Sequence, residues 1–165
     1  MRPLFFSMRT VLLPKSDEHI DTERNLIMGL DMYLDLLSDS NENDVHEVAY
    51  WRKASMIHNW FVENVQNGVD DCNAYVVEVE QIKSLLDICQ KLNDSFRDVD
   101  SIEFARIAEE ELPCANGFFF GSNQYDWAYA QGIEETVCML KQGLALYEQR
   151  ERQGSPMHFV YTSSW

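Results

Sequence analysis

Several side chains able to do chemistry fall within residues 50–72, where an aromatic segment runs into an acidic turn. The segment carries the basic pair Arg52 and Lys53 and the imidazole of His58, and the turn carries two carboxylates and a thiol, at Asp70, Asp71 and Cys72. Such groups transfer protons, attack electrophiles and bind anions. We expect a site here, in which Trp51 and Trp60 cover an apolar part of a ligand.

His58 has two interpretations. A half-buried histidine that donates a hydrogen bond to a nearby carbonyl or carboxylate is the plainer one. The other makes His58 a general base or a ligand-orienting donor, if the turn at Asp70–Cys72 folds back toward it. Metal binding by His58, Asp70, Asp71 and Cys72 lacks every strong ligand spacing, so no metal and no cofactor is predicted.

Arg52 and Lys53 are an adjacent basic pair in an acidic chain. They can be solvated helix residues that neutralise Glu47, Glu63 or Asp35. Alternatively, Arg52 clamps a carboxylate or phosphate through its planar fork while neighbouring aromatic rings cover the rest of the ligand.

A second polar segment follows the run of three phenylalanines at 118–120, with Ser122, Tyr125 and Asp126 as further ligand-binding candidates. Backbone N–H groups at a helix start can receive an anion. The segment lacks the Gly-Lys-Ser/Thr ending of a phosphate loop, and no Gly-x-Ser-x-Gly frame surrounds Ser122, which favours a turn role for that serine. The phenylalanines predict a short buried strand or a hydrophobic plug.

The elements that position these residues follow from hydrophobic periodicity. Alternation predicts a strand over 29–37, and Asp44 with Glu47 has the form of a helix start, so a helix is expected from Asp44 to about Gln66. A strand over 74–79 and a helix with apolar positions between 82 and 92 come next, then an exposed loop and short helix over 93–112.

The end of the chain repeats these patterns. Asn123, with Asp126 three residues on, predicts the start of the longest helix, and residues 157–165 alternate as a strand expected beside the first one. About three strands and three principal helices predict an α+β fold, a small and mainly antiparallel sheet covered on one face as a two-layer sandwich.

Composition limits the function. The chain has 165 residues and a formal charge of −15, so one domain over residues 28–165 is expected, with residues 1–27 as an N-terminal extension. This charge repels phosphate backbones and anionic membranes, so no direct binding to nucleic acid or membrane is expected. It favours a basic protein partner, including a nucleic-acid enzyme whose channel an acidic protein can occupy.

The four cysteines form no zinc or disulfide pattern and suit a reducing cytoplasm. Cys89 and Cys138 lie on apolar helical stripes and are expected in the core. No segment has the apolar length of a membrane helix, which supports the cytoplasmic expectation.

Five short motifs within residues 28–165 together resemble a family of small uncharacterised proteins of bacteriophages and bacterial genomes. They are residues 28–34, residues 50–62 with the Tyr-Trp-Arg-Lys-Ala start, residues 68–72, residues 117–126 and the closing Ser-Ser-Trp at 163–165. The resemblance implies a phage setting, with the host cytoplasm as compartment, and implies no activity.

Three functions remain open. The first is an interaction protein, phage-encoded, that binds and modulates a basic host protein such as a nucleic-acid enzyme or a defence component. The second is a small-ligand site or enzyme around Arg52, His58, Asp71 and Asp126, which requires these side chains to share one pocket. The third is an assembly component that forms homo-oligomers through exposed aromatics.

Overall fold

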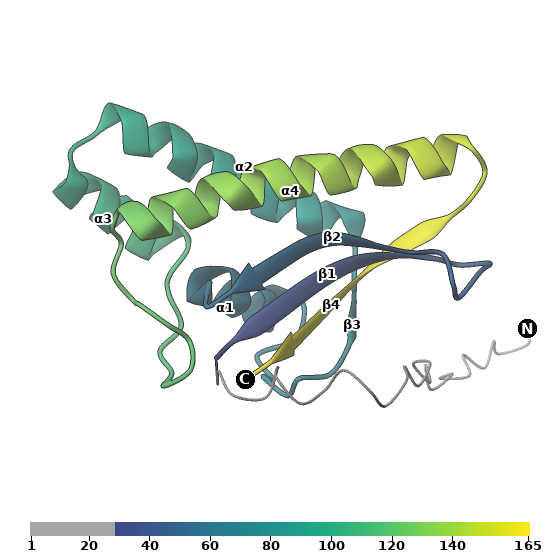
Figure 1. Cartoon of the computed structure of the whole chain (residues 1–165). Coiled ribbons are helices and arrows are strands. Elements are labelled where there is room, and N and C mark those ends of the chain that lie inside the picture. The colour runs from purple at the N-terminus through teal and green to yellow at the C-terminus, as the bar shows by residue number, and fades with distance from the viewer. Residues whose placement is uncertain (1–28) are drawn as a thin grey trace, which may run out of the picture.

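The computed structural model describes residues 29–165, so the expectation for residues 1–27 lies outside the described part. The α+β expectation is confirmed: one antiparallel sheet packs against a layer of helices (Figure 1). The sheet has four strands in the order β2-β1-β4-β3, one more than predicted. Four helices are described, α1 to α4.

The centre of the sheet pairs the two strands that are farthest apart in the chain. β1 (Asp31–Ser38) and β4 (Met157–Ser164) run antiparallel with Leu34 opposite Tyr161, which confirms the expected docking of the last strand on the first. Both strands alternate buried and half-buried residues, so one face of each enters the core. The last residues of the chain therefore complete the sheet.

The segment expected to begin the first helix is a strand. β2 (Val45–Arg52) pairs with β1 through a hairpin in which the Ser38 amide donates to the Asp44 carbonyl at 3.1 Å. The helix predicted over 44–66 was therefore wrong in its first half. Asp44 does not cap a helix; its carboxylate binds His46 at 2.8 Å and Arg150 at 3.3 Å. The spacing of the aromatic residues in this segment is compatible with a helix as well as with a strand, and hydrogen-bonded pairing with β1 selects the strand.

A short helix and a short strand follow β2. α1 (Ser55–Asn64) is the remaining half of the predicted helix. β3 (Tyr75–Val77) confirms the strand predicted over 74–79 but is shorter, because Val79 already begins the next helix. It pairs with β4. The backbone N–H of Glu78 donates to the Gln81 side chain at 2.9 Å, which helps to satisfy the start of that helix.

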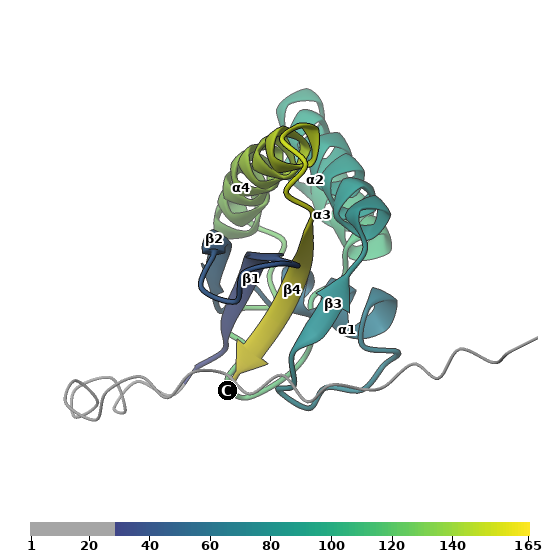
Figure 2. The same ribbon diagram turned by 90° about the vertical axis from the view of Figure 1, so that its right-hand side faces the viewer.

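Two long helices form most of the second layer. α2 (Val79–Asp98) and α4 (Trp127–Arg152) lie side by side on one face of the sheet (Figure 2). α3 (Ser101–Glu111) lies at one end of this layer (Figure 1). Asp126, not Asn123, is the N-cap of α4: its carboxylate accepts from the amides of Ala128 and Tyr129 at 2.9 and 3.2 Å. The predicted start was three residues early.

Two details of the expected core change. Cys89 is buried, and burial raises the pKa of its thiol to about 12, but Cys138 is exposed on α4 and is not a core residue. The phenylalanines at 118–120 form no strand. Phe118 is 93% exposed, and Phe120 is half-buried.

The opposite face of the sheet places two carboxylates directly across from each other. Asp35 on β1 faces Glu47 on β2, next to a register shift in the hairpin. Burial, and then the charge of Glu47, raise the pKa of Asp35. Like charges in opposite strand positions destabilise a sheet, so this pair works against the fold at neutral pH.

We predict that Asp35→Asn raises the free energy of unfolding at pH 7 by about 0.5 kcal/mol, because it removes that repulsion. A raised pKa in the folded state means that ionised Asp35 costs stability above this pKa, and the cost vanishes as pH falls through it. The gain should therefore be largest near neutral pH and absent near about pH 3. Urea titrations of both proteins measure it. Glu42→Gln in the hairpin loop is the control, and a less stable D35N protein would contradict the prediction.

Candidate functional site

The imidazole of His58 lies fully buried on α1, with both ring nitrogens engaged. Nε2 is 3.0 Å from a carboxylate oxygen of Asp70, and Nδ1 is 2.8 Å from the hydroxyl of Tyr161. A carboxylate only accepts, so Nε2–H donates to Asp70, and the Tyr161 hydroxyl can donate to Nδ1. The turn after α1 thus folds back onto the histidine, as one interpretation of the sequence required.

Aromatic rings close the space around this histidine. The Phe120 and Trp165 rings lie 5.1 and 5.7 Å from the imidazole, centre to centre, and Trp165 also contacts Phe120 at 6.1 Å. An imidazole with no exposed surface and two bonded nitrogens has no lone pair or proton to offer a ligand. The network of His58, Asp70 and Tyr161 therefore holds the structure together.

The neighbouring turn residues are also engaged. The Asp71 carboxylate accepts from the Asn73 amide at 3.1 Å and from the Tyr75 hydroxyl at 3.0 Å, and the bond from the Asn73 amide is the main cause of its lowered pKa. Desolvation raises the pKa of the Cys72 thiol, and the charges of Asp70 and Asp71 raise it further. A thiol that stays protonated is a poor nucleophile and a poor metal ligand.

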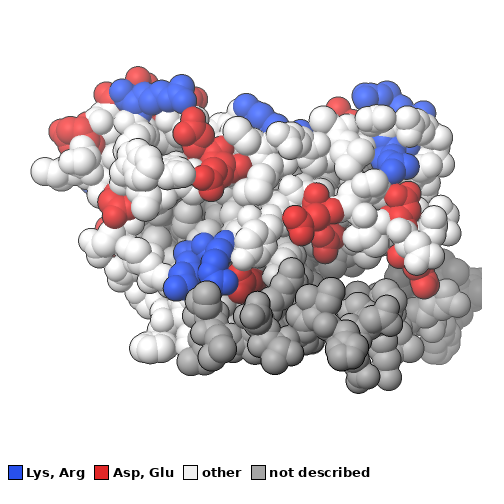
Figure 3. All heavy atoms as spheres, in the orientation of Figure 1, with Lys and Arg blue, Asp and Glu red and all other residues white. Residues whose placement is uncertain are grey.

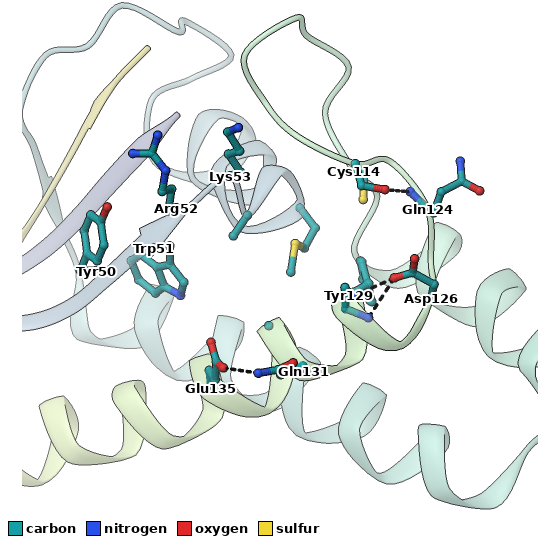
Figure 4. Close-up of a pocket in the computed structure, with 15 residues that line it drawn as sticks. Tyr50, Trp51, Arg52, Lys53, Cys114, Gln124, Asp126, Tyr129, Gln131 and Glu135 are labelled. Atoms are coloured by element: carbon teal, nitrogen blue, oxygen red, sulfur yellow. Dashed lines mark hydrogen bonds between the residues drawn. The ribbon is translucent and has the colours of Figure 1, made fainter. Parts of the chain in front are cut away.

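A pocket of about 460 Å³ opens between the end of β2 and the first turns of α4 (Figure 4). Five of the residues selected from the sequence line it: Trp51, Arg52, Lys53, Ser122 and Asp126. Residues that were not selected complete the wall, among them Met56, Cys114, Gln124, Tyr129, Gln131 and Glu135. His58 and the turn at 70–72 do not line it.

The β2 side of the pocket is held by hydrogen bonds. The indole N–H of Trp51 donates to the Thr136 hydroxyl on α4 at 2.9 Å, which ties strand to helix. Arg52 donates to both carboxylate oxygens of Asp31, at 2.9 and 3.0 Å, and Tyr50 donates to the same carboxylate at 2.6 Å. The guanidinium is thus neutralised by Asp31 and not by Glu47, Glu63 or Asp35.

Lys53 occupies an uncommon backbone conformation at this rim. Its φ is 56°, and its amide donates to the Leu30 carbonyl at 2.8 Å. A Cβ added to Gly121 would come within 2.9 Å of the Lys53 Cβ, and Gly121 has φ +89°, so this glycine permits the close approach of the loop. No described carboxylate forms an ion pair with the Lys53 ammonium.

The opposite wall comes from the loop before α4 and from α4 itself. The Ser122 hydroxyl accepts from the Gln124 amide at 3.1 Å, which is a turn role. The Gln131 side chain donates to Glu135 at 2.9 Å, one helical turn on, and Figure 4 shows both facing the hollow below Trp51. The sequence signal for this wall is a glutamine and a glutamate four residues apart, with the small Ala128 and Gly132 on the same face, and periodicity alone did not single it out.

Trp60 and Tyr125, two further candidates from the sequence, neither line the pocket nor hydrogen-bond to His58. Trp60 is buried and packs edge-on against Phe61 at 5.2 Å. The Tyr125 hydroxyl accepts from the Cys114 amide at 3.2 Å and so fixes the loop behind the pocket. Burial raises the pKa of the Cys114 thiol, which keeps it protonated beside the pocket.

Comparison of the chain with protein-family models, curated proteins and solved structures gives no match. Within residues 29–165, no helix combines the length and apolar character needed to cross a bilayer. The same residues contain no group of three or more histidine, cysteine or acidic side chains placed to hold a metal ion.

Loss of the Tyr161 hydroxyl tests the buried network. We expect Tyr161→Phe to lower the free energy of unfolding by about 1–2 kcal/mol, because Nδ1 of His58 is left buried without a partner. Tyr33→Phe removes the hydroxyl of a half-buried tyrosine of β1, on the other face of the sheet, and should change stability far less. Urea unfolding measures both, and equal effects of the two substitutions would contradict a structural network at His58.

Proposed function

We propose that this protein is a non-enzymatic interaction protein that binds a basic protein partner. The contact surface is the acidic end of the helical layer, which we define by seven acidic residues of α2, α3 and their flanks: Asp94, Asp98, Asp100, Glu103, Glu109, Glu110 and Glu111. In the phage setting that the sequence resemblance implies, the partner is a host protein in the cytoplasm, such as a nucleic-acid enzyme or a defence component.

The charge that would attract this partner belongs to the folded domain. Residues 1–28 contain four Lys or Arg and four Asp or Glu, so the formal charge of −15 lies entirely within residues 29–165. Figure 3 shows acidic side chains spread over the helical layer with basic ones between them. A field of this size accelerates encounter with basic surfaces and slows encounter with acidic ones.

The basic residues at the acidic end are already neutralised. Arg106 bonds Glu103 at 2.8 Å and Glu110 at 3.1 Å, and Arg97 pairs with Glu134 on α4 at 3.5 Å. These pairs are exposed and contribute little to stability. They leave most of the carboxylates of this end available to cations from outside.

An apolar hollow beside these carboxylates is the observation that carries the proposal. Phe96 on α2 and Trp127 on α4 line a hollow of about 180 Å³ that also includes Arg97 and Glu134. Trp127 is 68% exposed and Phe96 is 38% exposed, and Phe104 of α3 supports Phe96 edge-on at 5.0 Å. Exposed aromatic side chains next to charged residues are typical anchors of protein interfaces.

Charge and shape together define the occupant. A segment rich in Lys and Arg, carrying one apolar side chain, would place that side chain against Trp127 and Phe96 and its cations among the carboxylates. Long-range attraction would set the association rate, and the apolar contact would set the lifetime of the complex. An acidic segment would be repelled.

The test compares Trp127→Ala with Phe118→Ala, because both side chains are exposed aromatics and Phe118 lies in the loop at 117–121. Each protein is immobilised and exposed to host lysate, the bound protein is identified and purified, and its affinity for each variant is measured. We expect a partner with a basic segment whose binding is weakened roughly tenfold or more by Trp127→Ala and unchanged by Phe118→Ala.

The dependence of binding on ionic strength and the self-association of the protein can each contradict the proposal. Raising salt from about 50 mM to about 500 mM should weaken the complex strongly, because exposed charges are screened. Binding that salt does not weaken, or equal binding by both variants, would refute the proposal. Size-exclusion chromatography over a range of concentrations covers assembly: a dimer that Trp127→Ala dissociates would assign this end to a second copy of the chain instead.

A further inference from the structure

We infer that the pocket between β2 and α4 binds a small zwitterion, an amino acid or short peptide with an apolar side chain. The inference is independent of the proposed partner, whose surface uses Phe96, Trp127 and Glu134. The pocket instead uses Ala128, Gly132 and Glu135 of α4, and the two sites adjoin at Gln131, which lines both. A volume of about 460 Å³ is within the range of small-molecule sites.

One rim of the pocket is basic. Arg52 ends β2 there, and Lys53 directly follows the strand. Asp31 neutralises Arg52 through two hydrogen bonds, whereas Lys53 has no ion pair with any described carboxylate. The Lys53 side chain lies along the rim against Gly29, where an added Cβ would be 2.8 Å from its Cε. In a domain with a large excess of negative charge, this flexible side chain can turn its ammonium over the mouth of the pocket to meet a ligand carboxylate.

The opposite side of the pocket is acidic. Glu135 receives a hydrogen bond from Gln131 at 2.9 Å, and its carboxylate retains acceptor capacity because an ionised carboxylate accepts several bonds. Figure 4 shows Glu135 on the α4 side of the hollow and Lys53 on the β2 side, with the Lys53 ammonium directed out of the hollow. A ligand ammonium fits this side, while Asp126 is committed to the amides that begin α4.

The floor between the two charged sides is apolar and fixed in place. Trp51 is held by its bond to Thr136, and the hydroxyl of Tyr129 donates to the Leu112 carbonyl at 2.8 Å. Met56 meets α4 at Gly132, where an added Cβ would lie 3.0 Å from the methionine Cε. A preformed apolar floor accepts a side chain without a large ordering cost.

The net charge of the domain selects among ligands. A phosphate ester or dicarboxylate would be drawn to Lys53 but repelled by the formal charge of −15, and a simple amine would gain nothing from Lys53. A zwitterion has no net charge, so the overall field does not oppose it. It satisfies both sides of the pocket at once.

The test uses 15N-labelled protein and follows the Trp51 indole N–H and the backbone amides during titration with the twenty amino acids and with dipeptides of apolar residues. A Kd near 1 mM is readily measured in this way, with ligand up to about 10 mM. We expect at least one zwitterion to shift resonances of the pocket, with weaker binding after N-acetylation or after conversion of its carboxylate to an amide.

Variants assign the two charges. Lys53→Asn removes the ammonium with a residue that tolerates positive φ, and it should weaken binding roughly tenfold. The loss on conversion of the ligand carboxylate to an amide should then nearly disappear. Glu135→Gln should likewise weaken binding, and N-acetylation of the ligand should then cost little further affinity. Each protein charge and the ligand charge that it binds form one double-mutant cycle. Lys141→Gln, at an exposed lysine farther along α4, should leave binding unchanged.

Filling the pocket with a bulky side chain is an independent test. Ala128→Trp fills the pocket from α4 and should abolish binding, whereas Ala145→Trp adds the same side chain at an exposed position farther along that helix. Three results would each overturn the inference: no zwitterion shifts the pocket resonances, N-acetylated ligands or inorganic phosphate bind as well as zwitterions, or the two tryptophan variants bind equally. Loss of the proposed partner interaction in Trp127→Ala would not bear on any of them.

Discussion

The stacking of Tyr161 on Phe61 is the contact on which the rest of the structure depends. The two rings lie 3.9 Å apart, centre to centre, and 9° from parallel, and the Tyr161 hydroxyl bonds His58 on the same helix. Tyr161 belongs to β4, which pairs with β1 on one side and β3 on the other. One residue near the end of the chain therefore joins α1 to the middle of the sheet, and desolvation raises its pKa as expected for a buried phenol.

Both proposed sites depend on this frame without being part of it. α4 runs across the sheet, held to β2 by the bond from Trp51 to Thr136, and its first turns border two hollows that adjoin at Gln131. Toward β2 they line the pocket with mixed charge, and toward α2 they line the apolar hollow next to the acidic end. A rigid helix that begins at one capping carboxylate, Asp126, fixes the position of both surfaces relative to the sheet.

Much of the fold could be predicted because its signals are local. Alternation of apolar and polar residues predicted β1 and β4 and their pairing. Apolar residues at helical spacing predicted α2 and α4. The boundary between β2 and α1 could not be found in this way, because Tyr50 and Trp51 fit either period and only pairing with β1 decides. The return of Asp70 to His58 was an open condition that the short chain distance allowed, and the partner Tyr161 lies 103 residues away and leaves no local signal. Arg52 and His58 are six residues apart, and one hypothesis from the sequence placed them in one hollow. Arg52 ends a strand and lines the pocket, whereas His58 lies on α1 and faces the core.

The central claim is that β4 and α1 are the stable frame on which the surfaces are carried, and native-state hydrogen exchange of the β4 amides tests it most directly. If the claim holds, the amides of Phe159 and Tyr161 exchange only through global unfolding, with an opening free energy equal to the free energy of unfolding from urea titration. If these amides exchange through local opening while those of α2 and α4 stay protected, β4 is a peripheral strand and the account is wrong.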